Sequence, residues 1–218
     1  MILQQANGIF RSKTLEELDW AEHGFGTRHS AWPAPERLAT LKQIHSNLVF
    51  DAAAPGLIGE GDALITNEPG VLVGVKTADC VPILLADFRN RVVAAVHAGW
   101  RGTAAEIVLR TLEAMRQNYK TNPEDIRAAI GPCIGACCYE VGPDVAGRFR
   151  HWLPDLQPGT RQMLDLISAN QTQLRAAGVL ASNVDSGAPC TYCRPEHLHS
   201  FRRDGERAGR MISAIGVR

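Results

Sequence analysis

Residues 71–102 read VLVGVKTADCVPILLADFRNRVVAAVHAGWRG, and this stretch decides the fold. It contains three short apolar runs, at 71–75, 81–85 and 91–96, which are rich in apolar or β-branched residues and bounded by Gly, Asp or Asn, a pattern that predicts strands. Cys80 precedes the second run and His97 follows the third. A thiol and an imidazole at strand ends have rigid supports, so we expect the chemistry of the protein here.

Regular elements extend outward from this stretch. Further strands are predicted at 63–66 and 126–130. Thr103 and Glu106 have the spacing of a capping box, and apolar residues follow them at helical spacing, which predicts a helix that begins there. A second helix is predicted over 164–177, where a glycine ends it. Mixed sheets covered by helices, an α+β fold, are therefore expected.

The composition limits the class of partner. The chain has 45% hydrophobic residues, and its 23 basic residues balance 23 acidic ones, so no net charge attracts nucleic acid or an anionic membrane, and a small-molecule partner is expected. The apolar runs are far shorter than the roughly 20 residues of a membrane span, and residues 1–5 do not resemble a secretory signal, so a cytoplasmic protein without membrane contact is predicted. Residues 1–218 are expected to form one domain.

The chain contains six cysteines. A reducing compartment disfavours a disulfide framework, so metal binding, catalysis or core packing must explain them. His45, in the motif KQIHS, is a natural companion for Cys80 and His97. Two imidazoles and one thiolate with a vacant fourth position match the open sites of catalytic zinc. Spacing alone leaves the alternative of a core thiol and surface histidines.

Several motifs together resemble the YfiH family. They are TADCVPILLAD at 77–87, AAVHAGWRG at 94–102, GPCIG at 131–135 followed by CYEVG at 138–142, and the shorter GDALIT at 61–66 and SFRRDG at 200–205. The resemblance covers most of the chain and implies a layered α/β/β/α fold. It also implies that His45, Cys80 and His97 are the zinc ligands. The family is similar in fold to cysteine–histidine hydrolases of the toxin deamidase type.

The resemblance also implies a function. Members of the family are named polyphenol oxidase, laccase-domain protein or purine nucleoside phosphorylase, and those described as phosphorylases also deaminate adenosine. We therefore expect a zinc-dependent enzyme whose partners are a nucleoside and phosphate. It would convert adenosine or inosine, and also methylthioadenosine, to free base and ribose 1-phosphate, and it would deaminate adenosine.

Arginines within these motifs, and Arg28 at the end of the matching stretch GFGTR at 24–28, are candidates for the phosphate site, because a guanidinium forms a planar fork for anions. Arg101 is expected to act in catalysis and substrate binding, and Arg28 and Arg202 in substrate binding; the alternative for each is a solvated surface charge. Cys80 and His97 are also predicted as catalytic residues. Asp79 is a candidate proton shuttle, and its alternative role is to cap a turn.

The chain departs from the family pattern after Arg28. Relatives continue with a Gly-Gly-Val-Ser stretch and a longer insertion, whereas here only residues 29–40 separate Arg28 from the KQIH motif. Part of the rim of the pocket is therefore expected to be missing. Loops carry specificity, so the substrate preference of relatives transfers less directly than the metal ligands.

Other functions remain open from the sequence. A multicopper oxidase needs several His-x-His pairs, and among seven histidines only His197 and His199 form one, so copper-dependent polyphenol oxidation is expected as a side activity at most. A metal-free hydrolase using Cys80 and His97, acting on a peptidoglycan precursor peptide, is a second alternative. A non-enzymatic zinc-binding protein is the third.

The remaining cysteines suggest a rival site. Cys133 and Cys137 are one residue too far apart for the Pro-Cys-x-x-Cys motif of nucleobase deaminases. Cys190 and Cys193 have zinc-knuckle spacing and would complete a structural site with Cys133, Cys137 or Cys138. Buried free cysteine is the ordinary alternative.

Overall fold

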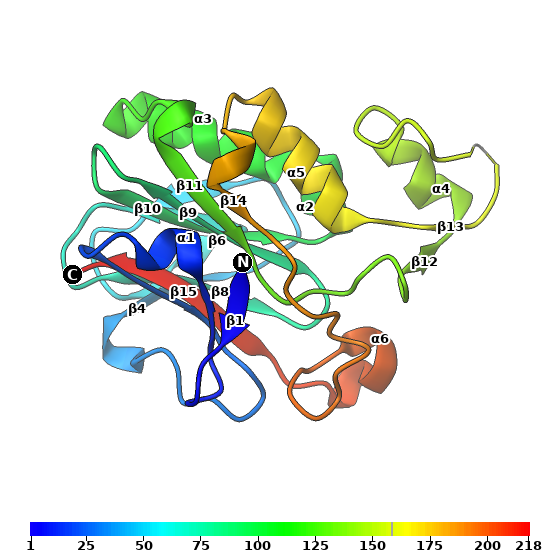
Figure 1. Cartoon of the computed structure of the whole chain (residues 1–218), viewed down its shortest axis with the longest axis horizontal. Coiled ribbons are helices and arrows are strands. Elements are labelled where there is room, and N and C mark those ends of the chain that lie inside the picture. Colours follow the sequence, from blue (N-terminus) through cyan, green and yellow to red (C-terminus); the bar gives the residue numbers. More distant parts are fainter. Residues whose placement is uncertain (158) are drawn as a thin grey trace.

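Two β-sheets form the centre of the molecule in the computed structural model, which describes residues 1–157 and 159–218 (Figure 1). The first sheet has the strand order β1 (Ile2–Gln4), β2 (Phe10–Ser12), β3 (Ala21–Phe25), β15 (Met211–Val217), β8 (Leu72–Thr77), β4 (Leu38–Lys42) and β6 (Gly56–Glu60). The second has the order β14 (Val184–Asp185), β11 (Ile126–Ile130), β9 (Val81–Asp87), β10 (Val92–Ala98), β7 (Ala63–Thr66) and β5 (Val49–Asp51). A small ribbon pairs β12 (Glu140–Val141) with β13 (Gln162–Met163).

The two longest helices lie together on one side of the sheets (Figure 1). They are α3 (Ile107–Tyr119) and α5 (Leu166–Ala176). The shorter helices are α1 (Lys13–Glu16), α2 (Trp100–Ala104), α4 (Pro143–Ala146) and α6 (Phe201–Asp204). Single 3-10 turns cover Pro35–Arg37, Pro123–Asp125, Gly147–Phe149, Ala181–Asn183 and Gly205–Arg207. No helix in the described part of the chain has the length and apolar character needed to cross a membrane.

Strand β9 is buried along its whole length because both faces of its sheet are covered. Ile83 and Leu85 pack in the cluster that includes Val108 and Leu174 of the helices. Leu84 alternates with them and packs in a second cluster, between the sheets. A strand covered on both faces needs apolar residues at every position, which explains the unbroken apolar run in the sequence.

The central antiparallel pair positions the site. Strands β9 and β10 pair with Pro82 opposite His97 and Val81 opposite Ala98. Cys80, one residue before β9, therefore lies beside His97 near the end of β10. The strand predictions for this segment are confirmed, and β7 and β11 have the predicted bounds. The mixed α+β architecture expected from the sequence is also confirmed.

The predicted start of the first long helix was wrong. Thr103 lies inside α2, and its Oγ1 donates a hydrogen bond to Ala98 O rather than capping a helix. Glu106 precedes α3 with a left-handed backbone, φ 63°, and its side chain forms no capping bond. Helix α2 begins at Trp100, directly after β10 ends at Ala98. Thr103 therefore belongs to α2, whereas Glu106 lies in the break before α3. The second helix agrees with its prediction, with Asp165 as the cap and a positive φ at Gly178.

Candidate active site

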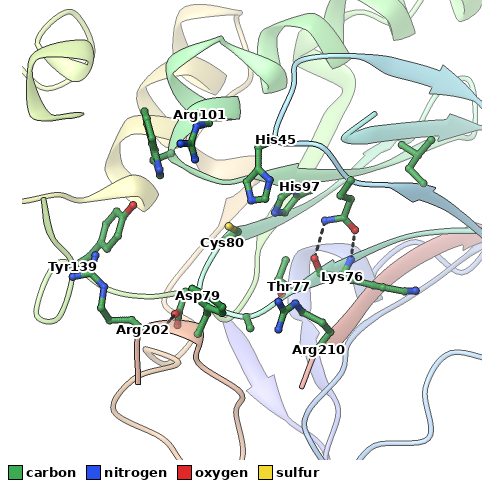
Figure 2. Close-up of a pocket in the computed structure, with 15 residues that line it drawn as sticks. His45, Lys76, Thr77, Asp79, Cys80, His97, Arg101, Tyr139, Arg202 and Arg210 are labelled. Carbon is green, nitrogen blue, oxygen red and sulfur yellow. Dashed lines mark hydrogen bonds between the residues drawn. The ribbon is translucent and has the colours of Figure 1, made fainter. Parts of the chain in front are cut away.

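Three side chains from three parts of the chain meet at the end of the central strands. His45 follows β4, Cys80 precedes β9, and His97 lies in β10. One ligand atom from each lies within 4.8 Å of the others. The two imidazole rings meet edge to face, with centroids 5.0 Å apart and planes at 74°. Figure 2 shows the three side chains grouped at the centre of the pocket. The structure thus brings together the trio expected from the sequence.

Asp62 organises this trio from beneath. It is fully buried in the turn between β6 and β7, and it accepts hydrogen bonds from the backbone N–H groups of His45 (3.0 Å) and Ser46 (2.6 Å) and from Ser46 Oγ (2.7 Å). Its Oδ1 lies 2.7 Å from His97 Nδ1. Hydrogen bonds from His97 and Ser46 outweigh the effect of burial and lower the pKa of Asp62 to about 2. Asp62 is therefore an ionised acceptor that holds two of the three residues.

The contact with Asp62 decides which nitrogen of His97 is free. An ionised carboxylate only accepts, so Nδ1 carries the proton and Nε2 is left to bind a metal or to take a proton from Cys80. Burial would lower the pKa of His97, but its bonds to Asp62 and Cys80 prevail and raise it to about 9. Metal-binding histidines commonly donate their other N–H to a carboxylate in this way.

The same neighbours activate the thiol. Burial would raise the pKa of Cys80, but hydrogen bonds from His45 and His97 outweigh it and lower the pKa to about 7. A thiolate is the form that binds metal and the form that acts as a nucleophile. Cys80 is therefore prepared for either role near neutral pH.

The backbone near the trio is shaped for close approach. His45 and Asp79 both have positive φ, 60° and 90°, conformations that only a few per cent of residues other than glycine adopt. Gly99 leaves room for the ligands, because a Cβ there would lie 2.9 Å from Cys80 Sγ and 3.3 Å from His45 Cδ2. A side chain at Gly99 would therefore displace two members of the trio.

A cavity of about 600 Å³ opens above the trio. This volume suits a small-molecule ligand. Its lining residues are Leu41, Gln43, His45, Lys76, Thr77, Ala78, Asp79, Cys80, His97, Trp100, Arg101, Tyr139, Phe201, Arg202 and Arg210. In Figure 2, Arg101 lies on one side of the trio, Tyr139 and Arg202 on another, and Lys76 and Arg210 on a third.

Four cationic side chains give the cavity a positive character. They are Lys76, Arg101, Arg202 and Arg210. The guanidinium of Arg101 stacks over the Trp100 ring at 4.3 Å, and that of Arg202 over Tyr139 at 5.1 Å. Stacking fixes the plane of a guanidinium and leaves its N–H fork free for an anion.

The carboxylate of Asp79 is already engaged. Its Oδ1 accepts from Thr191 Oγ1 (2.6 Å), and its Oδ2 accepts from the backbone N–H of Arg202 (2.6 Å). These contacts favour the positioning role that the sequence left open as the alternative to a proton shuttle. Asp79 ties the start of α6, and with it Arg202, to the loop that carries Cys80.

Two other arginines from the motifs lie outside the cavity lining. Arg28 donates from its backbone N–H to His197 O (2.9 Å) and from its side chain to Pro195 O. Arg203 donates to the carbonyl groups of Thr191 (2.8 Å) and Leu198 (2.8 Å) and pairs with its neighbour Asp204. The structure thus brings Arg101 and Arg202 to the pocket and places Arg28 against a neighbouring loop.

Sequence reasoning missed several residues of the site. Asp62 lies within the motif GDALIT, but no role was predicted for it. Its position directly before the apolar strand 63–66 could have marked it as a site residue. Lys76 and Gln43 also line the cavity, and the Gln43 amide bridges Lys76 by donating to its O (2.8 Å) and accepting from its N–H (2.7 Å). Tyr139 reaches the cavity at the end of the loop between β11 and β12, so its neighbours in sequence do not mark it as a site residue.

The donor set fits an open metal site. Two imidazoles and one thiolate bind zinc and leave one coordination position vacant, and copper also accepts these ligands. A multicopper arrangement would need many more imidazoles. Within residues 1–157 and 159–218, the other group of potential ligands consists of cysteines alone.

Comparison with known proteins identifies the family. A family model described as "Multi-copper polyphenol oxidoreductase laccase" matches residues 27–218. The chain belongs to this family. The solved structure of the hypothetical protein YfiH of Bacillus licheniformis superimposes with a TM-score of 0.88 at 26% identity, and the match covers 100% of this chain and 99% of that one. The resemblance to the YfiH family is confirmed.

Relatives that match most of the chain are named as enzymes of purine nucleosides. A purine nucleoside phosphorylase of Deinococcus radiodurans is 43% identical over 189 residues, which are 84% of this chain and 72% of the relative. Adenosine deaminase RL5, from an unknown prokaryotic organism, is 39% identical over 186 residues, 82% of this chain and 70% of the relative. The family's description names an oxidoreductase, whereas these relatives are named for nucleoside chemistry.

Proposed function

We propose that the chain is a zinc-dependent purine nucleoside enzyme, which cleaves adenosine, inosine and methylthioadenosine with phosphate and also deaminates adenosine. The observation that carries this proposal is the His45, Cys80 and His97 trio at the base of a cavity lined by cations and aromatic rings. The names of the relatives from Deinococcus radiodurans and of RL5 support the same reactions. A cytoplasmic location is part of the same proposal, because thiolate metal ligands persist in a reducing compartment.

Arg101 and Arg202 are the proposed phosphate-binding residues. Arg101 and Arg202 approach the cavity from α2 and α6, and each guanidinium is held by an aromatic ring. A fork held in this way binds an oxyanion through two parallel N–H groups. Orienting phosphate against the sugar accelerates phosphorolysis, because a bound nucleophile reacts as if it were at very high concentration.

The nucleoside base requires an apolar face. Phe201 is 44% exposed and lines the cavity together with Trp100 and Tyr139. Purines stack on aromatic rings with a contribution of about 1–3 kcal/mol per base. We assign binding of the purine to these aromatic rings.

The two reactions differ in the bond that breaks. In phosphorolysis a phosphate oxygen bonds to C1′ of the ribose while the C1′–N9 bond breaks, and the base leaves with a proton. In deamination a water oxygen bonds to C6 and the amino group leaves as ammonia. A zinc ion held by His45, Cys80 and His97 would supply Lewis acidity and activate water. Asp62 keeps His45 and His97 oriented, and Arg101 holds the anion.

The test uses purified protein, inosine and adenosine. Phosphate-dependent release of hypoxanthine from inosine, and formation of both adenine and inosine from adenosine, are the expected results by chromatography. Cys80→Ala and His97→Ala should abolish both activities together with the zinc bound by the trio, because each removes a ligand. Loss of deamination with intact phosphorolysis in either variant would overturn the assignment of both reactions to one site.

A metal-free hydrolase is the second candidate, and one observation favours it. Asp62, His97 and Cys80 form a line in which the imidazole lies between a carboxylate and a thiol with a lowered pKa. This is the arrangement of an activated cysteine nucleophile. A peptidoglycan precursor peptide is the proposed substrate. Activity that survives chelation but not alkylation of Cys80 would identify this reaction.

Copper-dependent polyphenol oxidation and non-enzymatic zinc binding complete the alternatives. The family's description supports the first, and copper accepts the same imidazole and thiolate ligands. Oxidation of a phenolic dye that requires added copper and is lost in Cys80→Ala would support this side activity. A cavity of about 600 Å³ above the trio favours an enzyme over a closed structural site.

A further inference from the structure

A second cluster of potential metal ligands lies away from the trio. It consists of Cys137, Cys138, Cys190 and Cys193, whose sulfur atoms all lie within 4.8 Å of one another. Two come from the loop between β11 and β12, and two from the loop after β14. We call this group the cysteine cluster.

A backbone bridge brings the two loops together. Cys133 and Cys190 form an isolated parallel bridge, and the N–H of Thr191 donates to Cys133 O at 2.9 Å. Cys133 itself is buried and belongs to the helix-facing core. Core packing therefore explains Cys133, but it does not explain Cys137 and Cys193, which are exposed.

The separations suit a single metal ion. Cys138 Sγ lies 3.4 Å from Cys193 Sγ, and Cys137 Sγ lies 3.9 Å from it. Four thiolates about 2.3 Å from one tetrahedral zinc ion are about 3.8 Å apart. A disulfide would require about 2.0 Å. The four cysteine sulfurs that bind a two-iron cluster must be spread more widely, because the cluster places two metal ions between them. The cysteine cluster, in which every sulfur lies within 4.8 Å of the others, is too compact for this arrangement.

The backbone around the cluster is also arranged for thiolates. The N–H of Gly135 donates to Cys190 Sγ at 3.2 Å. Gly135 has no side chain to block this approach: a Cβ there would lie 3.3 Å from Cys137 Sγ and 3.5 Å from Cys190 Cβ. Cys190 and Cys193 have the two-residue spacing of a zinc knuckle.

We propose that the cysteine cluster binds one structural zinc ion through four thiolates. It is independent of the trio, since the two groups share no residue. Four protein ligands fill a tetrahedral shell and leave no position for water or substrate, so this site is closed, unlike that of His45, Cys80 and His97. Thiolate ligands exclude magnesium and calcium and favour zinc.

The cysteine cluster lies beside loops that form part of the cavity wall. Thr191 lies between the two knuckle cysteines and donates to Asp79 at 2.6 Å. Arg203 donates to the carbonyl groups of Thr191 (2.8 Å) and Tyr192 (3.0 Å). Tyr139, which lines the cavity, directly follows Cys138. Joining the two loops through zinc would therefore fix the wall of the substrate cavity.

Elemental analysis of the full chain, purified without chelator, tests this proposal. Wild type should contain two zinc ions per chain, Cys193→Ser one, Cys80→Ser one, and the double variant none. Cys133→Ala is the matched control, because this thiol adjoins the cluster without belonging to it, and it should retain two. The proposal fails if wild type contains a single zinc that Cys80→Ser removes, or if Cys193→Ser retains two.

Cobalt substitution of wild type covers the case in which a variant does not fold. Cobalt in a four-thiolate site gives intense visible absorption with strong sulfur charge-transfer bands, distinct from a site with two nitrogens and one sulfur. We expect two cobalt ions per chain, one of them with the four-thiolate spectrum. A single cobalt without that spectrum, or a disulfide among these cysteines in the mass of freshly purified protein, would overturn the proposal. Neither result would bear on nucleoside turnover, so the two proposals fail separately.

Discussion

His97 Nδ1 donates to Asp62 Oδ1 at 2.7 Å, and the same carboxylate binds the backbone of the turn that carries His45. One buried acid thus orients two imidazoles that are far apart in sequence. The first prediction follows from this arrangement.

Asp62→Asn should lower the zinc affinity of the site formed by His45, Cys80 and His97 by about 10–100-fold, the range typical for loss of a group that orients a ligand. The amide cannot accept from all of its present donors, and His97 loses its ionised partner. Zinc competition with a chromophoric chelator measures the effect. Asp87→Asn is the matched control, because Asp87 is equally buried and accepts from the backbone of Arg89 (2.9 Å) but lies at the other end of β9. Equal zinc affinity of the two variants would contradict the role of Asp62.

Gly99→Ala should weaken metal binding without unfolding the chain. The added Cβ would lie 2.9 Å from Cys80 Sγ, so the thiol or the helix must move. We expect at least a tenfold loss of zinc affinity, about 1.4 kcal/mol. Gly142→Ala provides the control, since Gly142 also precedes a short helix and has no atom within 4 Å of the added Cβ. If both variants bind zinc like wild type, the packing at Gly99 does not constrain the site.

Arg101→Lys should raise the phosphate KM about tenfold, the effect of losing one charge-assisted hydrogen bond of roughly 1.5 kcal/mol, while zinc content stays constant. The charge remains but the planar fork is lost. Phosphate titration at saturating inosine gives the measurement. Arg28→Lys should leave the phosphate KM unchanged, because Arg28 donates to Pro195 O outside the cavity lining. A change in the Arg28 variant alone would show that the anion binds elsewhere.

His23 should make stability depend on pH below neutrality. Burial lowers its pKa to about 3, and the ring accepts a hydrogen bond from Ser12 N–H (2.9 Å), so the folded chain holds it neutral. The unfolded chain binds the proton near pH 6.5, so the contribution of His23 is complete above that pH and is lost as the pH falls toward 3. The free energy of unfolding should fall by up to about 1.4 kcal/mol per pH unit between pH 6 and 4.

Urea unfolding at several pH values measures this slope. His23→Gln keeps an acceptor for Ser12 but does not titrate, so its slope should be smaller in this window. Asp185, whose pKa is lowered to about 2 despite burial because it pairs with the N-terminus and Ser12, adds its own loss below its ordinary value near 3.8. Parallel curves for wild type and His23→Gln would show that His23 is not the group responsible.

The sequence predicted the part of the site that depends on local pattern. Strands β9 and β10 are apolar because their sheet is covered on both faces, so their ends could be located, and with them Cys80 and His97. Asp62 could not be recognised in this way. Its role depends on donors in a separate turn, at His45 and Ser46, and on His97 in another strand.

The arginines show a second limit. Arg28 and Arg202 both lie in family motifs, and the sequence offered no means of separating them. The difference arises from the loop at 187–199, against which Arg28 folds and beside which α6 begins. The capping-box error has a similar cause: Thr103 lies inside the short helix α2 and donates to Ala98 O, an arrangement that the spacing of residues does not reveal.

The cavity combines two kinds of construction. Its base rests on strands with both faces buried, whereas its wall combines the short helices α2 and α6 with irregular loops, joined by a few contacts such as that of Thr191 with Asp79. Substitutions in the wall can therefore change which molecule fits, while the strands of the base keep the trio in place. For enzyme engineering, this separates the choice of substrate from the retention of chemistry: libraries directed at the wall sample new specificities at little cost to folding.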